Sequence, residues 1–108
     1  MNLSTEIFGD VIVVHTPEEL SSDHADAFEG YLPTLDRRQI ILDLDGTELL
    51  DSRGLAALLN AQEKVRGLGG DVKVASSNAT NRKILEITRL DQQLEVFENV
   101  IDAVRSFR

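Results

Sequence analysis

The stretch LLDSRGLAALL, residues 49–59, joins an apolar pair to a helical pattern through four residues of a different character. Asp51, Ser52, Arg53 and Gly54 are polar or small, whereas residues 55–59 are all alanine or leucine. A serine just ahead of a periodic apolar run is a common helix N-cap. The stretch therefore predicts a helix that begins near Ser52, where the serine is either a helix cap or a functional residue.

The predicted helix has one apolar stripe and a glycine-rich end. The stripe has helical spacing and consists of Leu55, Leu58, Leu59, Val65 and Leu68. Gly67, Gly69 and Gly70 come next and precede a strand pattern, DVKVAS. Glycine loops that bind phosphate lie between a strand and the following helix, so the reverse order here predicts a helix C-cap.

Strand and helix patterns alternate on both sides of this helix. Upstream, TEIFGDVIVVH (5–15) predicts a hairpin, and QIILDL (39–44) predicts a central strand. Between them, TPEE (16–19) predicts the start of a helix that carries Ala25, Phe28, Leu32 and Leu35 and ends near Pro33. Downstream, Asn78 is expected to cap a helix with Ile84, Leu85, Ile87 and Leu90, LEVF (94–97) to form the last strand, and Asn99 to open a closing helix.

This order predicts a single α/β domain over residues 1–108. Its sheet should be mostly parallel, with about five strands and about four helices, because strands alternate with helices after the hairpin. Function in such folds gathers at the carboxyl ends of the strands. We therefore single out three loops, at His15-Thr16, Gly46 to Ser52, and Ser76 to Asn78.

Composition narrows the classes of function. The net charge of −8 on 108 residues argues against a nucleic-acid or membrane partner, but not against a protein with a basic face. The chain has no cysteine, which excludes disulfides and thiolate chemistry. The sequence also shows no signal peptide and no apolar run of membrane-spanning length. We expect a soluble, cytoplasmic protein that is a monomer or a weak dimer.

One pattern suggests an enzyme. DLDGT (43–47) resembles the nucleophile loop of the haloacid dehalogenase-like phosphatases, which would make Asp43 the nucleophile and Asp45 the acid or base beside Mg²⁺. That family also needs a downstream basic residue, an acidic cluster and a longer chain. Asp43 is expected instead to bond nearby backbone amides, and His15 and His24 form no catalytic pattern. We therefore expect no catalytic residue, no metal ligand and no cofactor.

Taken together, the motifs resemble the STAS domain, and within it the bacterial anti-sigma-factor antagonists. The family pattern is an apolar strand ending in Asp-Leu, a short loop, and Asp-Ser-x-Gly-Leu at the start of a helix. Here these elements are IILDL, DGTELL and DSRGL. The later stretches RGLGGDVKVAS and ILEITRLDQQLEVFENVIDAV fit as well, so that the resemblance covers residues 5 to 106.

The resemblance implies a phosphorylation switch. In this family a partner that is both a serine kinase and an anti-sigma factor phosphorylates the motif serine, here Ser52. The unphosphorylated protein binds that partner, the phosphorylated protein releases it, and a phosphatase resets the serine. The implied partner-binding residues are Glu48, Asp51, Ser52, Arg53 and Gly54. The alternative within the family is a STAS scaffold in a stressosome, a lipid-transport complex or another phospho-signalling system.

The chemistry of the motif agrees with this role, with one departure. A helix N-terminus tolerates phosphate, while about −1.5 to −2 added charges, next to Glu48 and Asp51, would disrupt a contact surface. The position of Arg53 is usually small in the family. An arginine there would shield the phosphate, contact an acidic partner, or mark a member that is not phosphorylated.

Overall fold

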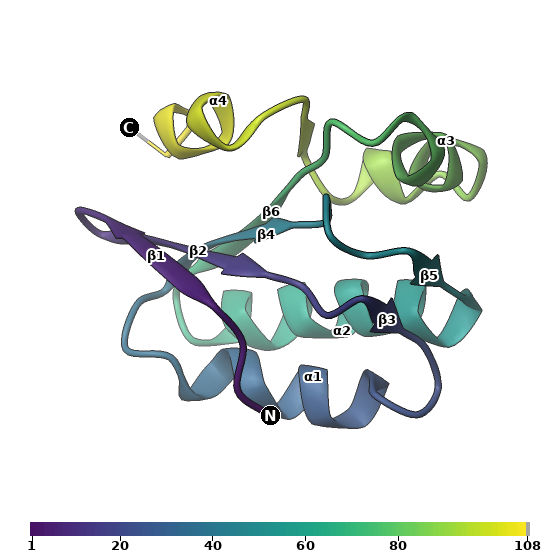
Figure 1. The fold of residues 1–108 in the computed structure, drawn as a ribbon. Coiled ribbons are helices and arrows are strands. Elements are labelled where there is room, and N and C mark those ends of the chain that lie inside the picture. The colour runs from purple at the N-terminus through teal and green to yellow at the C-terminus, as the bar shows by residue number, and fades with distance from the viewer. Residues whose placement is uncertain (108) are drawn as a thin grey trace.

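The computed structural model describes residues 1–107, which form a five-stranded sheet and a separate two-stranded one (Figure 1). The main sheet has the order β1-β2-β4-β6-β7, in which β1 is antiparallel to β2 and the other neighbours are parallel. Its strands are β1 (Thr5–Phe8), β2 (Val11–His15), β4 (Gln39–Asp43), β6 (Asp71–Ala75) and β7 (Val96–Phe97). The small sheet pairs β3 (Glu19–Leu20) with β5 (Leu49–Leu50) in parallel.

Residues 1–107 form four α-helices around the main sheet. They are α1 (Ala25–Tyr31), α2 (Ser52–Gly67), α3 (Ala79–Ile87) and α4 (Val100–Arg105), with short 3₁₀ turns η1 (Leu32–Thr34) and η2 (Leu90–Gln92). Figure 1 shows α1 and α2 below the sheet, α4 above it, and α3 near the end where the parallel strands finish. None of the helices within residues 1–107 is both long and apolar enough to cross a membrane.

The central strand β4 is buried on both faces. Ile40 and Leu42 belong to the larger core cluster, between the sheet and helices α1 and α2. Ile41 belongs to the smaller cluster, between the sheet and α4. Side chains alternate between the two faces of a strand, so a strand covered on both sides has to be apolar at every position. The continuous apolar run of QIILDL follows from this placement, and the predicted α/β architecture is confirmed.

Two predicted helix boundaries are wrong. The segment at residues 16–19 does not begin a helix, because Glu19 and Leu20 form β3 and the helix starts only at Ala25. Pairing with β5 buries Leu20 completely in the core, which outweighs the local helix signal. At the other end of the chain, the third helix stops at Ile87 rather than reaching Leu90.

The early end of α3 has a backbone cause. Arg89 has φ of 62°, a left-handed conformation that ends the helix and turns the chain. Leu90 then lies in η2 and is buried after the turn. The periodic pattern correctly marked Leu90 as a core residue but not as a helical continuation of α3.

Gly70 provides a test of the packing between β4 and β6. A Cβ atom on Gly70 would lie 2.1 Å from the Arg38 carbonyl oxygen, whereas one on Gly67 would meet nothing within 4 Å. We expect Gly70→Ala to lower the free energy of unfolding by about 1–3 kcal/mol, the usual cost of overpacking. The control Gly67→Ala, at the end of α2, should raise it by up to about 1 kcal/mol. Urea denaturation compares the two, and equal stability would contradict this packing.

Candidate functional site

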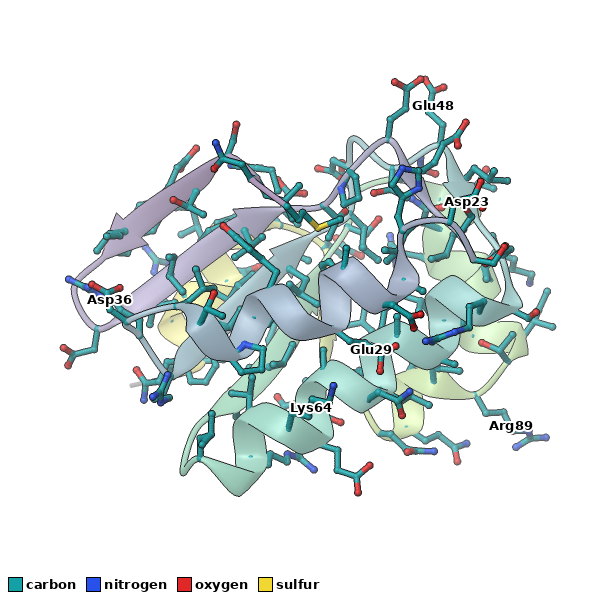
Figure 2. All side chains as sticks on the ribbon, turned by 90° about the horizontal axis from the view of Figure 1, so that it is seen from below. Asp23, Glu29, Asp36, Glu48, Lys64 and Arg89 are labelled. Atoms are coloured by element: carbon teal, nitrogen blue, oxygen red, sulfur yellow. The ribbon has the colours of Figure 1, made fainter. Side chains whose placement is uncertain are left out.

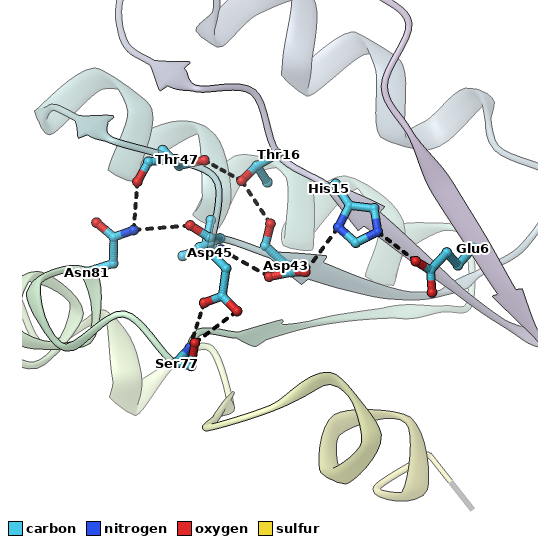
Figure 3. Close-up of polar contacts among 9 residues, drawn as sticks. Glu6, His15, Thr16, Asp43, Asp45, Thr47, Ser77 and Asn81 are labelled. Carbon is cyan, nitrogen blue, oxygen red and sulfur yellow. Dashed lines mark hydrogen bonds and ion pairs between the residues drawn. The ribbon is translucent and has the colours of Figure 1, made fainter.

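Hydrogen bonds join the three loops at the carboxyl ends of β2, β4 and β6 (Figure 3). The Thr16 hydroxyl donates to the Asp43 carbonyl oxygen at 3.0 Å, and the Thr47 hydroxyl donates to the Pro17 carbonyl oxygen at 2.6 Å. Thr16 and Thr47 are both buried, with their hydroxyl groups next to each other. The chain after β2 is therefore bound to the loop that leads from β4 toward Ser52.

Asn81 holds the same loop from α3. Its side-chain amide donates to the carbonyl oxygens of Leu44 and Thr47, at 3.1 and 2.9 Å. Asn81 is only 2% exposed, so these bonds satisfy carbonyl groups that water does not reach. The loop is thus anchored on one side by β2 and on the other by α3.

Asp43 and Asp45, the two phosphatase candidates, both bond to neighbouring groups. Asp43 accepts from the Asp45 backbone N–H at 3.0 Å, as predicted from its place at the strand end, and its other oxygen lies 3.0 Å from His15 Nδ1. Asp45 accepts from the backbone N–H and the hydroxyl of Ser77, at 2.7 and 3.0 Å. His15 also lies 3.2 Å from Glu6. These contacts link β1 to the start of α3 across the end of the sheet (Figure 3).

Ser52 is the first residue of α2, and it is not the N-cap. Asp51 is the N-cap: one of its carboxylate oxygens accepts from the Gly54 N–H at 2.8 Å, and the other accepts from the Ser22 N–H at 3.3 Å. The expectation that Ser52 caps the helix is therefore wrong. An aspartate directly before it does so, and Ser52 is left exposed with its hydroxyl outside the cap.

Gly54 lies beneath the loop. A Cβ atom on Gly54 would lie 1.9 Å from the carbonyl oxygen of Leu20, so no side chain fits between α2 and β3. Gly54 is buried, whereas Glu48 and Ser52 are exposed. Gly54, one of the implied partner-binding residues, is therefore buried at the contact between α2 and β3 and allows the close approach of these two elements.

The segments that lead to Ser52 or lie next to it carry exposed acids and an exposed leucine. Leu49, in β5, is 47% exposed, while its neighbour Leu50 is buried. Backbone bonds from Glu48 and Leu49 to the Glu18 carbonyl oxygen fix this edge. The exposed acids of the nearby segments are Glu18, Glu19, Asp23, Asp26 and Glu48. Figure 2 shows Glu48 and Asp23 projecting at the same end of the molecule.

Arg53 is directed at α1. Its Nη2 atom lies 2.7 Å from Glu29 Oε2 and also forms an ion pair with Asp26. The close pairing with Glu29, helped by Asp26, raises the pKa of Arg53 against the opposing effect of burial, so the guanidinium stays charged. Sequence reasoning did not find Glu29, Thr47 or Asn81. A carboxylate on the same face of the predicted helix as Ala25, Phe28 and Leu32 was the available signal for Glu29.

The Asn81 bonds can be tested by substitution. We expect Asn81→Ala to lower the free energy of unfolding by about 1–3 kcal/mol, because the Thr47 carbonyl loses its side-chain donor and the Leu44 carbonyl keeps only the Thr47 N–H. Asn60→Ala, at an exposed position of α2, should change it by about 0.5 kcal/mol or less. Denaturant unfolding measures both, and matching stabilities of the two variants would contradict the anchoring role.

Asn81→Asp adds a pH signature. The carboxylate would face two carbonyl oxygens in a buried site, so its pKa in the folded protein should be raised above the unfolded value. Stability should then be present at low pH and be lost as the pH rises through that folded pKa. Unfolding curves of this variant across the acid range measure the effect, and pH-independent stability relative to wild type would contradict it.

Comparison with known proteins gives the same picture of the fold. A protein of Thermotoga neapolitana named "Putative anti-sigma factor antagonist TM1081 homolog" is 26% identical over 103 residues, 92% of this chain and 91% of that protein. The crystal structure of an anti-sigma factor antagonist from Mycobacterium paratuberculosis has a TM-score of 0.83 at 24% identity, covering 97% of this chain and 92% of that one.

A second solved structure is that of a phosphorylated protein. SpoIIAA, a cell fate determinant of Bacillus, in its phosphorylated form, has a TM-score of 0.69 at 16% identity, covering 99% of this chain and 100% of that one. At these identities the structures establish the fold. The family model named STAS domain matches residues 2–103, nearly the whole chain. The chain therefore belongs to the STAS domain family.

Proposed function

We propose that this protein is an anti-sigma-factor antagonist controlled by phosphorylation of Ser52. It binds a serine-kinase anti-sigma factor when Ser52 is unmodified, releases it when Ser52 carries phosphate, and is reset by a phosphatase. It acts as a binding module without catalytic activity of its own. The observation that carries the proposal is the exposed Ser52 at the first position of α2, in a chain where Asp51 already caps the helix.

The position of Ser52 supports modification without unfolding. The first N–H groups of a helix lack intrahelical partners, and the helix dipole favours negative charge there. A phosphate on Ser52 meets that end of α2 and displaces no capping bond, because the cap is the Asp51 carboxylate. The fold should therefore persist in both states, and the switch should operate through the surface.

The surroundings of Ser52 support binding that phosphate would disrupt. Leu49, 47% exposed, offers an apolar contact three residues before Ser52, and a charge added beside such a contact has to be desolvated when a partner binds. Phosphate adds about −1.5 to −2 charges and new bulk at the centre of that contact. Close packing around Leu49 would then be lost, even with a basic partner. The relatives named as anti-sigma factor antagonists are consistent with a partner of this class.

Two substitutions at Ser52 separate a switch from a structural serine. Because Ser52 does not cap the helix, Ser52→Ala should change the free energy of unfolding by about 0.5 kcal/mol or less and leave partner binding intact. Ser52→Asp should be equally stable, since the helix dipole favours the added charge. It should bind the partner at least about tenfold more weakly, a loss of about 1.4 kcal/mol. Melting temperature and partner affinity are the two measurements.

The matched control is Asn60→Asp, which adds the same charge to an exposed position further along α2. The partner is recovered from the source cell with Ser52→Ala as bait, and we expect a serine kinase of the histidine-kinase-like ATPase type. A Ser52→Asp variant that binds as tightly as wild type would contradict the proposal. Equal weakening by Asn60→Asp would contradict a specific role for residue 52.

A further inference from the structure

Glu29 is a buried carboxylate that the proposed switch leaves unexplained. It is 7% exposed and lies on α1, on the side that packs against α2 (Figure 2). Within residues 1–107, Arg53 is the cation that forms an ion pair with it, at 2.7 Å. The same Arg53 atom pairs with Asp26, whose side chain is 91% exposed. The Arg53 guanidinium thus pairs with one buried and one exposed carboxylate.

The two acids hold Arg53 with different strength. An exposed ion pair is weak, because water solvates both charges nearly as well. A buried carboxylate that loses its cation is left uncompensated where water cannot reach it, and this is strongly unfavourable. The side chain of Glu29 is 9% exposed and that of Arg53 37% exposed. A group that draws Arg53 away from Glu29 must therefore offset the cost of leaving the Glu29 carboxylate buried without its cation.

The next residue to Arg53 is Ser52, the proposed phosphoacceptor. A phosphate there would be a strong new acceptor next to Arg53 in the sequence, and arginine pairs with phosphate readily. The other charged neighbours in the loop, Glu48 and Asp51, are acids. Arg53 is therefore the cation of this loop that can pair either with Glu29 or with the phosphate. If it stays with Glu29, the phosphate charge is not neutralised at the surface.

We propose that Arg53 is reserved for Glu29, so that phosphate on Ser52 remains without a side-chain counter-ion. This inference rests on the proposed function of Ser52. The arginine that replaces the usual small residue ties the first turn of α2 to α1 and does not shield the phosphate. The phosphorylated protein then presents the full added charge to its partner, and Glu29 is the residue that determines this.

The side-chain Nη–H signals of Arg53 in ¹⁵N NMR spectra report its partner directly, because both ion pairs are formed by Nη2. Phosphoserine is placed at position 52 during translation, so the experiment needs neither kinase nor partner and is independent of the proposed function's own test. In the wild-type background we expect the Arg53 signal to be the same with serine and with phosphoserine. In the background Asp26→Asn/Glu29→Gln, where Arg53 has lost both acids, phosphoserine should move the signal downfield.

The outcomes are decisive in both backgrounds. A wild-type signal that moves on phosphorylation overturns the proposal, because Arg53 then leaves Glu29 for the phosphate. An Arg53 signal that does not move on phosphorylation of the Asp26→Asn/Glu29→Gln variant overturns the proposal as well, because Arg53 then does not bind the phosphate even without its two acids. Arg66, which pairs with Asp71 at the far end of α2, is the internal control and should not respond. Should Asp26→Asn/Glu29→Gln unfold, Asp26→Asn/Glu29→Met replaces it, since an apolar side chain fits a buried site.

Discussion

The first turn of α2 packs on the backbone of β3, and the two come together only because residue 54 has no side chain. This contact sets the position of the whole loop. With α2 held there, Asp51 reaches both the Gly54 N–H and the Ser22 N–H, and Leu20 enters the core beside β5. Ser52 is then the residue that turns outward. The exposure of the serine is thus a consequence of the glycine two positions later.

Polar groups divide into an inner and an outer set around this loop. The inner set of Thr16, Thr47 and Asn81 is buried and hydrogen-bonded, and it fixes the loop against β2 and α3. The outer set is acidic and exposed, and it lies on the segments next to the loop: Glu18, Glu19, Asp23, Asp26 and Glu48. Arg53 belongs to neither, because it turns inward to Glu29. The buried hydrogen bonds hold the loop in one position beneath the charged surface. A phosphate added to that surface therefore changes the binding of the partner and leaves the fold unchanged.

Local patterns in the sequence predicted most of the fold, and contacts distant in sequence account for what they missed. The hairpin, the buried strand QIILDL and the caps at Asn78 and Asn99 were predictable, because each depends on neighbouring residues. The two-residue strands β3 and β5 have no pattern of their own and exist because Leu20 and Leu50 are buried together. At the site, Ser52 was predicted as a cap because serine commonly caps helices, but the adjacent Asp51 takes that position. The Arg53–Glu29 pair joins α1 to α2, which β4 and β5 separate in the sequence, so the inward position of Glu29 was the one local signal of the pair.

The central claim is that Ser52 accepts phosphate from the partner that the protein binds. Intact-mass measurement tests this most directly, after incubation with ATP and the serine kinase recovered from the source cell. We expect one added phosphoryl group on the wild-type chain, located on Ser52 by fragmentation, and none on a chain with alanine at that position. A wild-type mass that stays unchanged with an active kinase, or a phosphoryl group on any other residue, would contradict it.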